Sequence, residues 1–362
     1  CLSTVPGQDL DSDSIQVITE GDVLYREMCK AMDLAEKEIL LESYIFALDL
    51  IGEQFIAVLN KKAEQGLEIK IHLDAVGSHY YRNGQALKKK LHNNISLRWF
   101  HRWSWYRLWR FNVRNHRKLL VIDRKLIFMG GFNIHQQCSR QYYGIIRWRD
   151  THMILKTEEA ELVGKYFDDL WLRRPQRYYE STKNISFIPN LSRKCRFLLR
   201  CQLSQFITSA KVSIQLTTPY FVPDEYLIKD LIRASQRGIK VSLLVPDKGD
   251  HPLINTMAWH YYTRLTHSGI KVYAYLPRML HAKTMVVDSS IVMIGSANMD
   301  YRSLFINHEL VCLFVSKKIA EDLNILFKHD CEQSRVVTPL TKHTVQYWWL
   351  RRPIAALLKH LI

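Results

Sequence analysis

Two short stretches of the sequence carry the same three polar residue types at the same spacing, in the pattern H-x-K-x-x-x-x-D. The first set is His116, Lys118 and Asp123, and the second set is His281, Lys283 and Asp288. An imidazole can attack or donate a proton, and an ammonium group can bind a negatively charged oxygen. Two such sets together suit a displacement at a phosphate ester, because that reaction needs a nucleophile, a general acid and cations.

The spacing within each set indicates which of its residues share a face. Residues two apart in a strand project to the same side, so the histidine and the lysine of each set point together. Asp123 lies an odd number of positions after both residues, so in a strand its side chain points to the other face. It also lies between the apolar runs LLVI and LIFM. We therefore predict that Asp123, and Asp288 in the second set, fix a turn instead of contacting the histidine of their own set.

Each set is followed by a step of small residues and then an asparagine. Gly131 precedes Asn133 by two positions, and Ser296 precedes Asn298 in the same way. Small residues let polar groups approach a ligand closely, so we expect these four positions to contact phosphate oxygens. Only the second half offers a hydroxyl at the small position.

A histidine that acts as nucleophile or acid needs a carboxylate at its other ring nitrogen. Each half supplies a candidate after its motif: Asp150 in RWRDTHMIL and Glu309 in NHELVCLF. We predict that each acid orients the histidine of its own half, so that Asp150 serves His116 and Glu309 serves His281. One histidine then attacks phosphorus while the other protonates the leaving alcohol, and neither a metal ion nor a cofactor is expected.

The elements around the motifs are repeated as well. An apolar run at 35–46 is followed by a helical pattern that ends at Gly66 and by the alternating run LEIKIHLD, and the second half repeats this order with a helix ending at Gly238. We expect an α/β fold of two similar halves, each a mixed, largely parallel sheet flanked by helices, packed with pseudo-twofold symmetry. A basic, proline-containing segment predicts a linker near 175–190, with halves at 1–175 and 176–362.

The charge predicts an anionic partner. The chain has 51 Lys and Arg against 35 Asp and Glu, and the segment 75–122 holds 11 Lys or Arg but no acid. Tryptophan and arginine are interleaved at 97–115, and a similar mixture lies at 344–362, so both are candidate membrane-surface segments; packing in the core is the alternative. No window of the sequence holds 18 consecutive apolar residues, which predicts that membrane contact is made from the surface.

Cysteine usage indicates a reducing compartment. The seven cysteines are odd in number and include no C-x-x-C pair. We therefore expect free thiols and a cytoplasmic location, without a disulfide or zinc framework.

The two motifs resemble the signature of the phospholipase D superfamily. PYFVPDE, GGFNI, WRDTH and GSANMDYRSLFINHE look like segments of bacterial cardiolipin synthases, and the resemblance spans roughly residues 15–335. It implies transfer of a phosphatidyl group from phosphatidylglycerol, or another phospholipid, to a hydroxyl of a second phosphatidylglycerol through a phosphatidyl-histidine. His116 is implied as the nucleophile and His281 as the acid and base, with the lysines and asparagines on the phosphate; which histidine attacks first stays open.

The positive charge, the lack of a long apolar window and the lipid substrate that the resemblance implies together predict a location and a partner. The location is that of a peripheral membrane protein on the cytoplasmic face of the bacterial cell membrane, and the partner is an anionic phospholipid membrane. A phospholipase D-type hydrolase, with water as the acceptor, is the alternative activity.

Two further functions fit parts of the pattern. The superfamily includes nucleases, and basic and aromatic residues suit single-stranded nucleic acid. Nucleases with a single motif are short chains that pair, however, and tyrosyl-DNA phosphodiesterases replace the motif aspartate, whereas Asp123 and Asp288 are both present. An inactive lipid-binding scaffold predicts a degraded motif. We therefore expect a phosphatidyltransferase and no nucleic-acid partner.

Overall fold

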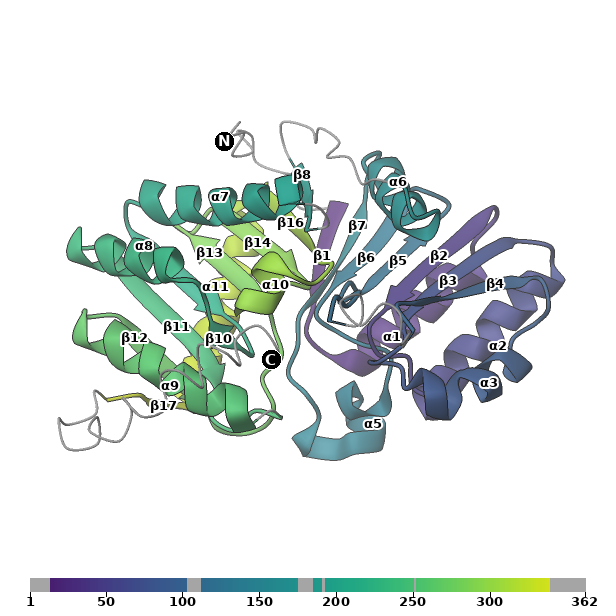
Figure 1. Ribbon diagram of the computed structural model, residues 1–362, viewed down its shortest axis with the longest axis horizontal. Coiled ribbons are helices and arrows are strands. Elements are labelled where there is room, and N and C mark those ends of the chain that lie inside the picture. The colour runs from purple at the N-terminus through teal and green to yellow at the C-terminus, as the bar shows by residue number, and fades with distance from the viewer. Residues whose placement is uncertain (1–13, 103–111, 175–184, 191–192, 251, 339–362) are drawn as a thin grey trace.

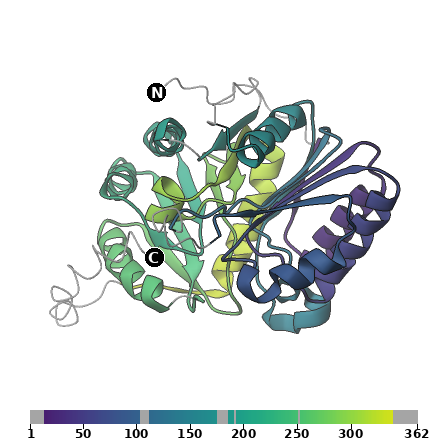
Figure 2. The same ribbon diagram turned by 45° about the vertical axis from the view of Figure 1, so that its right-hand side comes forward.

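The computed structural model places two β-sheets face to face at the centre, with helices on the outside of each (Figure 1). It describes residues 14–102, 112–174, 185–190, 193–250 and 252–338. The turned view in Figure 2 shows the first helices of the chain on the side of their sheet that faces away from the second half. Each sheet thus has one face covered by its own helices and one face turned toward the other sheet.

The first sheet has seven strands in the order β1-β7-β6-β5-β2-β3-β4. Their bounds are β1 (Ile15–Ile18), β2 (Glu38–Ser43), β3 (Glu68–Asp74), β4 (Ile95–Phe100), β5 (Leu119–Ile122), β6 (Leu126–Gly130) and β7 (His152–Lys156). The helices on its outer face are α1 (Gly21–Asp33), α2 (Leu50–Glu64) and α3 (Tyr80–Lys90). The Asp49 carboxylate caps α2 by accepting two of its first backbone amides.

The second sheet repeats this order as β8-β16-β14-β13-β9-β11-β12, with β17 added at the edge. Its strands are β8 (Ile185–Pro189), β9 (Ser213–Thr217), β11 (Lys240–Pro246), β12 (Lys271–Tyr275), β13 (Thr284–Val287), β14 (Ile291–Gly295), β16 (Leu310–Val315) and β17 (Ser334–Val336). The helices on its outer face are α7 (Arg193–Ser209), α8 (Glu225–Gln236) and α9 (Pro252–His267). A separate parallel pair joins β10 (Phe221–Val222) to β15 (Met299–Asp300). The matching strand orders confirm the prediction of two similar α/β halves.

Both sheets are mixed, but the predicted predominance of parallel pairing is wrong. Among the described strands, only β2–β3 and β3–β4 are parallel in the first sheet, and only β9–β11 and β11–β12 in the second. The other neighbours are antiparallel, and they include a hairpin within each motif, of β5 with β6 and of β13 with β14. The strand and helix pattern predicted the crossovers at the start of each half and missed these hairpins.

A core between the two sheets joins the halves. It contains Val121 and Met153 from the first sheet and Val292 and Phe314 from the second, together with residues of α6 (Ala160–Trp171) and α11 (Lys317–Glu332). Residues of the opposite parity in the same strands belong to the outer cores, so the central strands are apolar on both faces. This double burial fixes the register, since a slip by one residue would exchange the two faces.

The predicted linker at 175–190 is too long. Residues 175–184 lie outside the described part of the chain, and 185–189 form β8 at the edge of the second sheet. We propose that the boundary between the halves lies near residue 175, after α6.

The predicted membrane-surface segments lie largely outside the described residues. This holds for 103–111 and for 344–362. Residues 97–100 belong to β4, where Trp99 is partly buried against the outer core. Within the described ranges, no helix has the length and the apolar character needed to cross a bilayer.

The expectation that all cysteines are free thiols is wrong. Cys201 is disulfide-bonded, and its partner lies outside the described side chains. The free cysteines of the described chain are Cys29, Cys138, Cys312 and Cys331.

Candidate active site

The aspartate of each motif fixes the turn of its hairpin, as predicted. The Asp123 carboxylate accepts hydrogen bonds of 2.8–2.9 Å from the backbone amides of Glu36, Lys37 and Glu38, where β2 begins. The Asp288 carboxylate accepts bonds of 2.8–3.0 Å from the amides of Lys211, Val212 and Ser213, where β9 begins. Both aspartates have positive φ angles, of 50° and 52°. They tie each hairpin to its neighbouring strand, at the end of β5 or β13 remote from the motif histidine.

Short backbone bridges between the halves bring each histidine beside an acid-bearing segment. The amide of His116 donates to the carbonyl oxygen of His308 at 2.9 Å. The amide of His281 donates to the carbonyl oxygen of Arg149 at 2.7 Å. In both cases the residue that accepts this bond belongs to the other half and directly precedes its acid.

The predicted pairing of acid and histidine within each half is therefore wrong, because the halves exchange their carboxylates. Nδ1 of His116 lies 3.0 and 3.1 Å from the two carboxylate oxygens of Glu309. Nδ1 of His281 lies 2.5 Å from Oδ2 of Asp150. Strands β7 and β16 both contribute to the core between the sheets, so the acid that precedes each strand lies at the interface. The two histidine–carboxylate pairs form one site shared by both halves.

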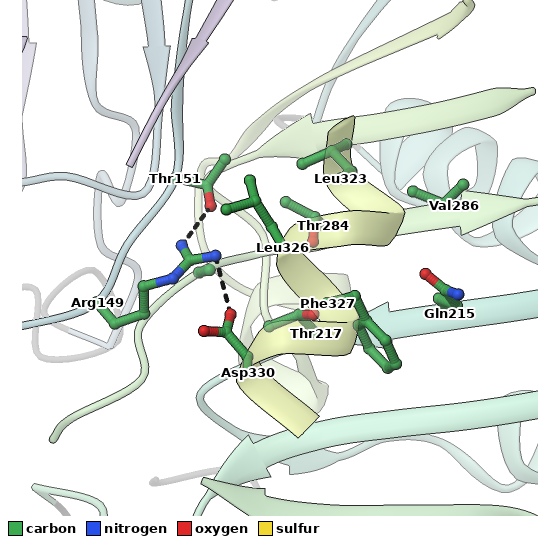
Figure 3. A pocket seen from close by; sticks show the side chains of 11 residues that line it. Arg149, Thr151, Gln215, Thr217, Thr284, Val286, Leu323, Leu326, Phe327 and Asp330 are labelled. Carbon is green, nitrogen blue, oxygen red and sulfur yellow. Dashed lines mark hydrogen bonds and ion pairs between the residues drawn. The ribbon is translucent and has the colours of Figure 1, made fainter. Parts of the chain in front are cut away.

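Asp150 is held by its own backbone and by an arginine clamp. Its Oδ1 accepts the Thr151 amide at 2.7 Å, which leaves Oδ2 for His281. Arg149 donates to the Asp150 carbonyl oxygen at 2.7 Å. Figure 3 shows its two other contacts, a hydrogen bond of 3.0 Å to the Thr151 hydroxyl and an ion pair of 2.9 Å with Asp330 of α11. The clamp thereby ties the segment that carries Asp150 to a helix of the other half.

The small residues after the motifs serve the carboxylates. A Cβ at Gly131 would lie 2.0 Å from Oδ1 of Asp150, so only glycine leaves room for this acid. The hydroxyl of Ser296 donates to Glu309 and accepts the Leu310 amide at 3.1 Å. Since its proton is used in this bond, Ser296 orients Glu309. The predicted contact of Gly131 and Ser296 with phosphate stays a prediction.

Ser303, which the sequence analysis missed, also contacts Glu309. Its hydroxyl donates to Oε1 at 2.8 Å. The short helix α10 (Tyr301–Phe305) positions it, and the Asp300 carboxylate caps this helix by accepting the Ser303 amide at 2.7 Å. Ser303 lies within the segment GSANMDYRSLFINHE, but its contact depends on the turn of α10, which spacing alone does not reveal.

The two carboxylates have different protonation tendencies. Burial raises the pKa of Glu309, but His116 and Lys118 outweigh it and hold this pKa below its usual value. Burial raises the pKa of Asp150 as well, and the nearby Lys283 lowers it without reversing the shift. Glu309 is therefore the more firmly ionised partner.

The histidines and lysines are buried together. Burial lowers the pKa of His116 to about 4 and the pKa of His281 well below its usual value, so both rings are neutral at pH 7. Lys283, Lys118 and His116 lower the pKa of His281 further, so charges of both motifs act on this ring. Burial lowers the pKa of Lys118 well below its usual value and the pKa of Lys283 to about 8.

Each lysine is oriented by the histidine two positions before it. Nζ of Lys118 donates to the His116 carbonyl oxygen at 2.7 Å, and Nζ of Lys283 donates to the His281 carbonyl oxygen. Nζ of Lys283 also lies 2.9 Å from Nδ1 of His281. The histidine and lysine of each motif lie together, as predicted, but all four residues directly precede the strands β5 and β13 and do not belong to them.

Two aromatic rings line the site, and neither was named as a site residue from the sequence. The Tyr44 ring lies 5.0 Å from the His116 ring, and the Trp148 ring lies 5.0 Å from the His281 ring. Trp148 belongs to the segment WRDTH and could have been found there. Tyr44 follows β2 without any motif of its own, so only the fold identifies it.

The two asparagines have different surroundings. Oδ1 of Asn133 accepts the Ile45 amide at 3.2 Å. Oδ1 of Asn298 is buried and has no hydrogen-bond partner among the described residues, while the Asn298 side chain bonds to Asp300. Burial raises the pKa of Asp300 to about 6. The predicted contact of both asparagines with phosphate stays a prediction.

Comparisons with known proteins show which family the chain resembles in sequence and in fold. Residues 28–171 and 203–331 match a family model described as "Cardiolipin synthase, PLD-like domain". The chain is 31% identical to cardiolipin synthase 1 of Staphylococcus aureus over 91% of this chain and 69% of the relative. It is also 31% identical to a cardiolipin synthase of Clostridium perfringens, over 90% and 71%. The crystal structure of phosphatidylserine synthase from Haemophilus influenzae has a TM-score of 0.78 at 14% identity, covering 98% of this chain and 96% of that one, which supports the fold.

Proposed function

The chain belongs to the cardiolipin synthase family of the phospholipase D superfamily, and on that premise we propose how its two histidines act. Its activity is that of a cardiolipin synthase-type phosphatidyltransferase. In our proposal a phosphatidyl group moves from one phosphatidylglycerol to a hydroxyl of a second one, and glycerol leaves. The main support for the proposal is the exchange of carboxylates. Glu309 and Asp150 each contact Nδ1 of one histidine, so Nε2 of each ring is available to react.

In the first step, Nε2 of His116 attacks phosphorus, and the bond from phosphorus to the glycerol oxygen breaks as the bond to nitrogen forms. The low pKa of His116 keeps its lone pair available, and the ionised Glu309 stabilises the positive charge that develops on the ring. His281 donates a proton to the departing oxygen. The phosphodiester anion supports this role, because a bound negative charge raises the pKa of His281 above its value in the free enzyme.

In the second step, His281 removes the proton from a hydroxyl of the second phosphatidylglycerol. That oxygen attacks phosphorus, the phosphorus–nitrogen bond breaks and His116 returns to its neutral form. Asp150 keeps the proton on Nδ1 of His281 during both steps, so Nε2 alternates between donor and acceptor.

The remaining polar groups hold the phosphate. Lys118 and Lys283 lie beside the two histidines and supply positive charge to the equatorial oxygens. Asn133 and Asn298 are proposed as further contacts, and the unpaired Oδ1 of Asn298 suits a hydroxyl of the glycerol headgroup.

Vesicles of phosphatidylglycerol without divalent metal provide the test. We expect cardiolipin and glycerol as products, in equal amounts, by lipid mass analysis and a glycerol assay. Phosphatidic acid with glycerol, and no cardiolipin, would show that water is the acceptor and that the chain acts as a hydrolase. Addition of competing alcohols identifies the preferred acceptor.

Single histidine variants test the shared site. His116→Ala and His281→Ala should each abolish transfer, since each ring has a separate task. His267→Ala is the matched control, because His267 is exposed at the end of α9. Normal turnover in either active-site variant would contradict the mechanism.

The homology indicates membrane association, and we propose peripheral attachment at the cytoplasmic face of the bacterial cell membrane. The disulfide at Cys201 removes the argument from reduced thiols. The proposal rests on the net charge of +16, which complements the negative surface of the cytoplasmic leaflet.

A further inference from the structure

We propose that a cavity between α3 and β4 is a docking site for the phosphate-bearing headgroup of an anionic membrane phospholipid, separate from the two-histidine site. The proposal rests on the proposed function, since it supplies the contact by which the enzyme holds the membrane that contains its substrate. The headgroup binds there without reacting, because no residue of the two H-x-K-x-x-x-x-D motifs lines the cavity.

The cavity has a volume of about 480 Å³ and combines cationic, aromatic and apolar walls. Its polar wall includes Lys88, His92 and Arg102, and Tyr80 and Trp99 provide aromatic rings. Leu91, which directly follows α3, and Ile95 and Leu97 of β4 provide apolar side chains. Cations suit a phosphate, and the aromatic and apolar walls suit the glycerol and upper acyl region of a lipid.

The charge around the cavity is unbalanced. The segment 75–122, which includes α3 and β4, contains no Asp or Glu. Lys88 and Lys89 are exposed on α3 and form no ion pair within the described residues, whereas Lys90 pairs with Glu53 at 2.9 Å. An external anion is therefore the available partner for the exposed cations of this face.

The two aromatic rings of the cavity contact each other, and one of them binds a cation of the lining. The Tyr80 and Trp99 rings pack edge to face with centroids 5.0 Å apart. Arg102 donates to the Tyr80 hydroxyl at 2.9 Å, and its guanidinium lies 5.2 Å from the centre of that ring. A preformed site of this kind loses little side-chain entropy when a headgroup binds.

The cavity is connected to the catalytic site through the start of α3. The loop after β3 contains Ser78, whose hydroxyl donates to the Tyr44 carbonyl oxygen at 2.9 Å. The Tyr44 ring in turn lies against His116. Asp74, at the end of β3, accepts the Asn115 amide at 2.9 Å, directly before His116. The loop that leads into α3 therefore contacts residues that lie beside His116.

Charge reversal at the cavity tests the proposal. The variant Lys88→Glu/Arg102→Glu should bind phosphatidylglycerol–phosphatidylcholine vesicles at least about 25-fold more weakly than the wild type, because each of the two basic groups near an anionic surface contributes about a factor of five. The control is Lys229→Glu/Arg233→Glu on α8, which changes the net charge equally at exposed positions in the other half. Cosedimentation at fixed salt measures binding, and thermal unfolding confirms that both variants fold.

Three outcomes would overturn the proposal. An equal loss in the control would mean that net charge alone drives binding. Equal binding of the cavity variant and the wild type would mean that the cavity does not contact lipid. If millimolar glycerol 3-phosphate displaced the wild type but not the cavity variant from vesicles, the cavity would be a site for soluble phosphate compounds.

Activity on short-chain phosphatidylglycerol below its micelle concentration separates docking from catalysis. The cavity variant should retain wild-type turnover of this soluble substrate, and loss of that turnover would assign the cavity to the reaction instead. If the wild type does not turn over phosphatidylglycerol at all, the proposed function fails, but vesicle binding still decides the docking proposal.

Discussion

Replacing Asp150 by asparagine tests the exchange of carboxylates between the halves most directly. Thr151 donates its amide to Oδ1, so the asparagine has to keep its carbonyl oxygen there, since the reverse orientation sets two N–H groups against each other. The amide nitrogen then faces Nδ1 of His281, which must accept the bond, and Lys283 at 2.9 Å can donate to the same atom. The proton moves to Nε2, which can no longer act as a base.

The structure predicts a much smaller effect for Glu309→Gln. Nδ1 of His116 lies 3.0 and 3.1 Å from the two oxygens of Glu309. The Ser296 hydroxyl can rotate to accept a hydrogen bond, so the glutamine can place its amide nitrogen beside Ser296 and its carbonyl oxygen at the Oε1 position, within reach of Nδ1. The loss is then one charge-assisted hydrogen bond, about 1.5–3 kcal/mol, or about 10- to 100-fold in rate. The wrong tautomer in Asp150→Asn costs about 10⁴-fold.

A phosphatidyl ester of p-nitrophenol separates the two steps, because its leaving group departs without protonation. Rapid mixing measures the burst of p-nitrophenol from the first step, and lipid analysis measures transfer in the second. We expect Asp150→Asn to share the phenotype of His281→Ala and Glu309→Gln to share that of His116→Ala, with the milder loss. The opposite matching, Asp150 with His116 and Glu309 with His281, would refute the exchange whichever histidine attacks first.

Three further predictions concern the framework, the lysines and the clamp. Asp288→Ala should lower the free energy of unfolding, measured in urea, by about 1–3 kcal/mol, because three backbone amides lose their acceptor. Turnover per folded molecule should stay within about twofold of the wild type. A large loss of turnover would place Asp288 in the reaction. The kcat/KM of the wild type should fall above pH 8 as Lys283 loses its proton. In Lys283→Arg, if active, this decline in the pH–rate profile should move to higher pH. A decline at the same pH as in the wild type would assign the titration to another group. Asp330→Asn should destabilise the fold by about 3–5 kcal/mol, because it leaves the buried Arg149 without its ionic partner. The control Glu225→Gln, at an exposed arginine pair, should cost at most about 1 kcal/mol. Equal losses in the two variants would show that the clamp is not a buried ion pair.

The local chemistry of the site could be read from the chain. Side-chain parity in a strand depends on neighbouring residues alone, so the shared face of histidine and lysine and the turn role of Asp123 and Asp288 followed from spacing. The repeated strand and helix pattern likewise predicted two similar α/β halves. The hairpins within the motifs also have a local signal, because an aspartate between two apolar runs marks a tight turn.

The sequence by itself determined which residues could form a phosphate-ester site, and only the tertiary structure decided how they are paired. The acids lie at similar distances after their motifs, so spacing makes pairing within each half and pairing across the halves equally possible. The backbone bridges from His116 to His308 and from His281 to Arg149 select the second arrangement. These contacts exist because two sheets bury a common apolar face, and burial between distant segments has no signature in local sequence.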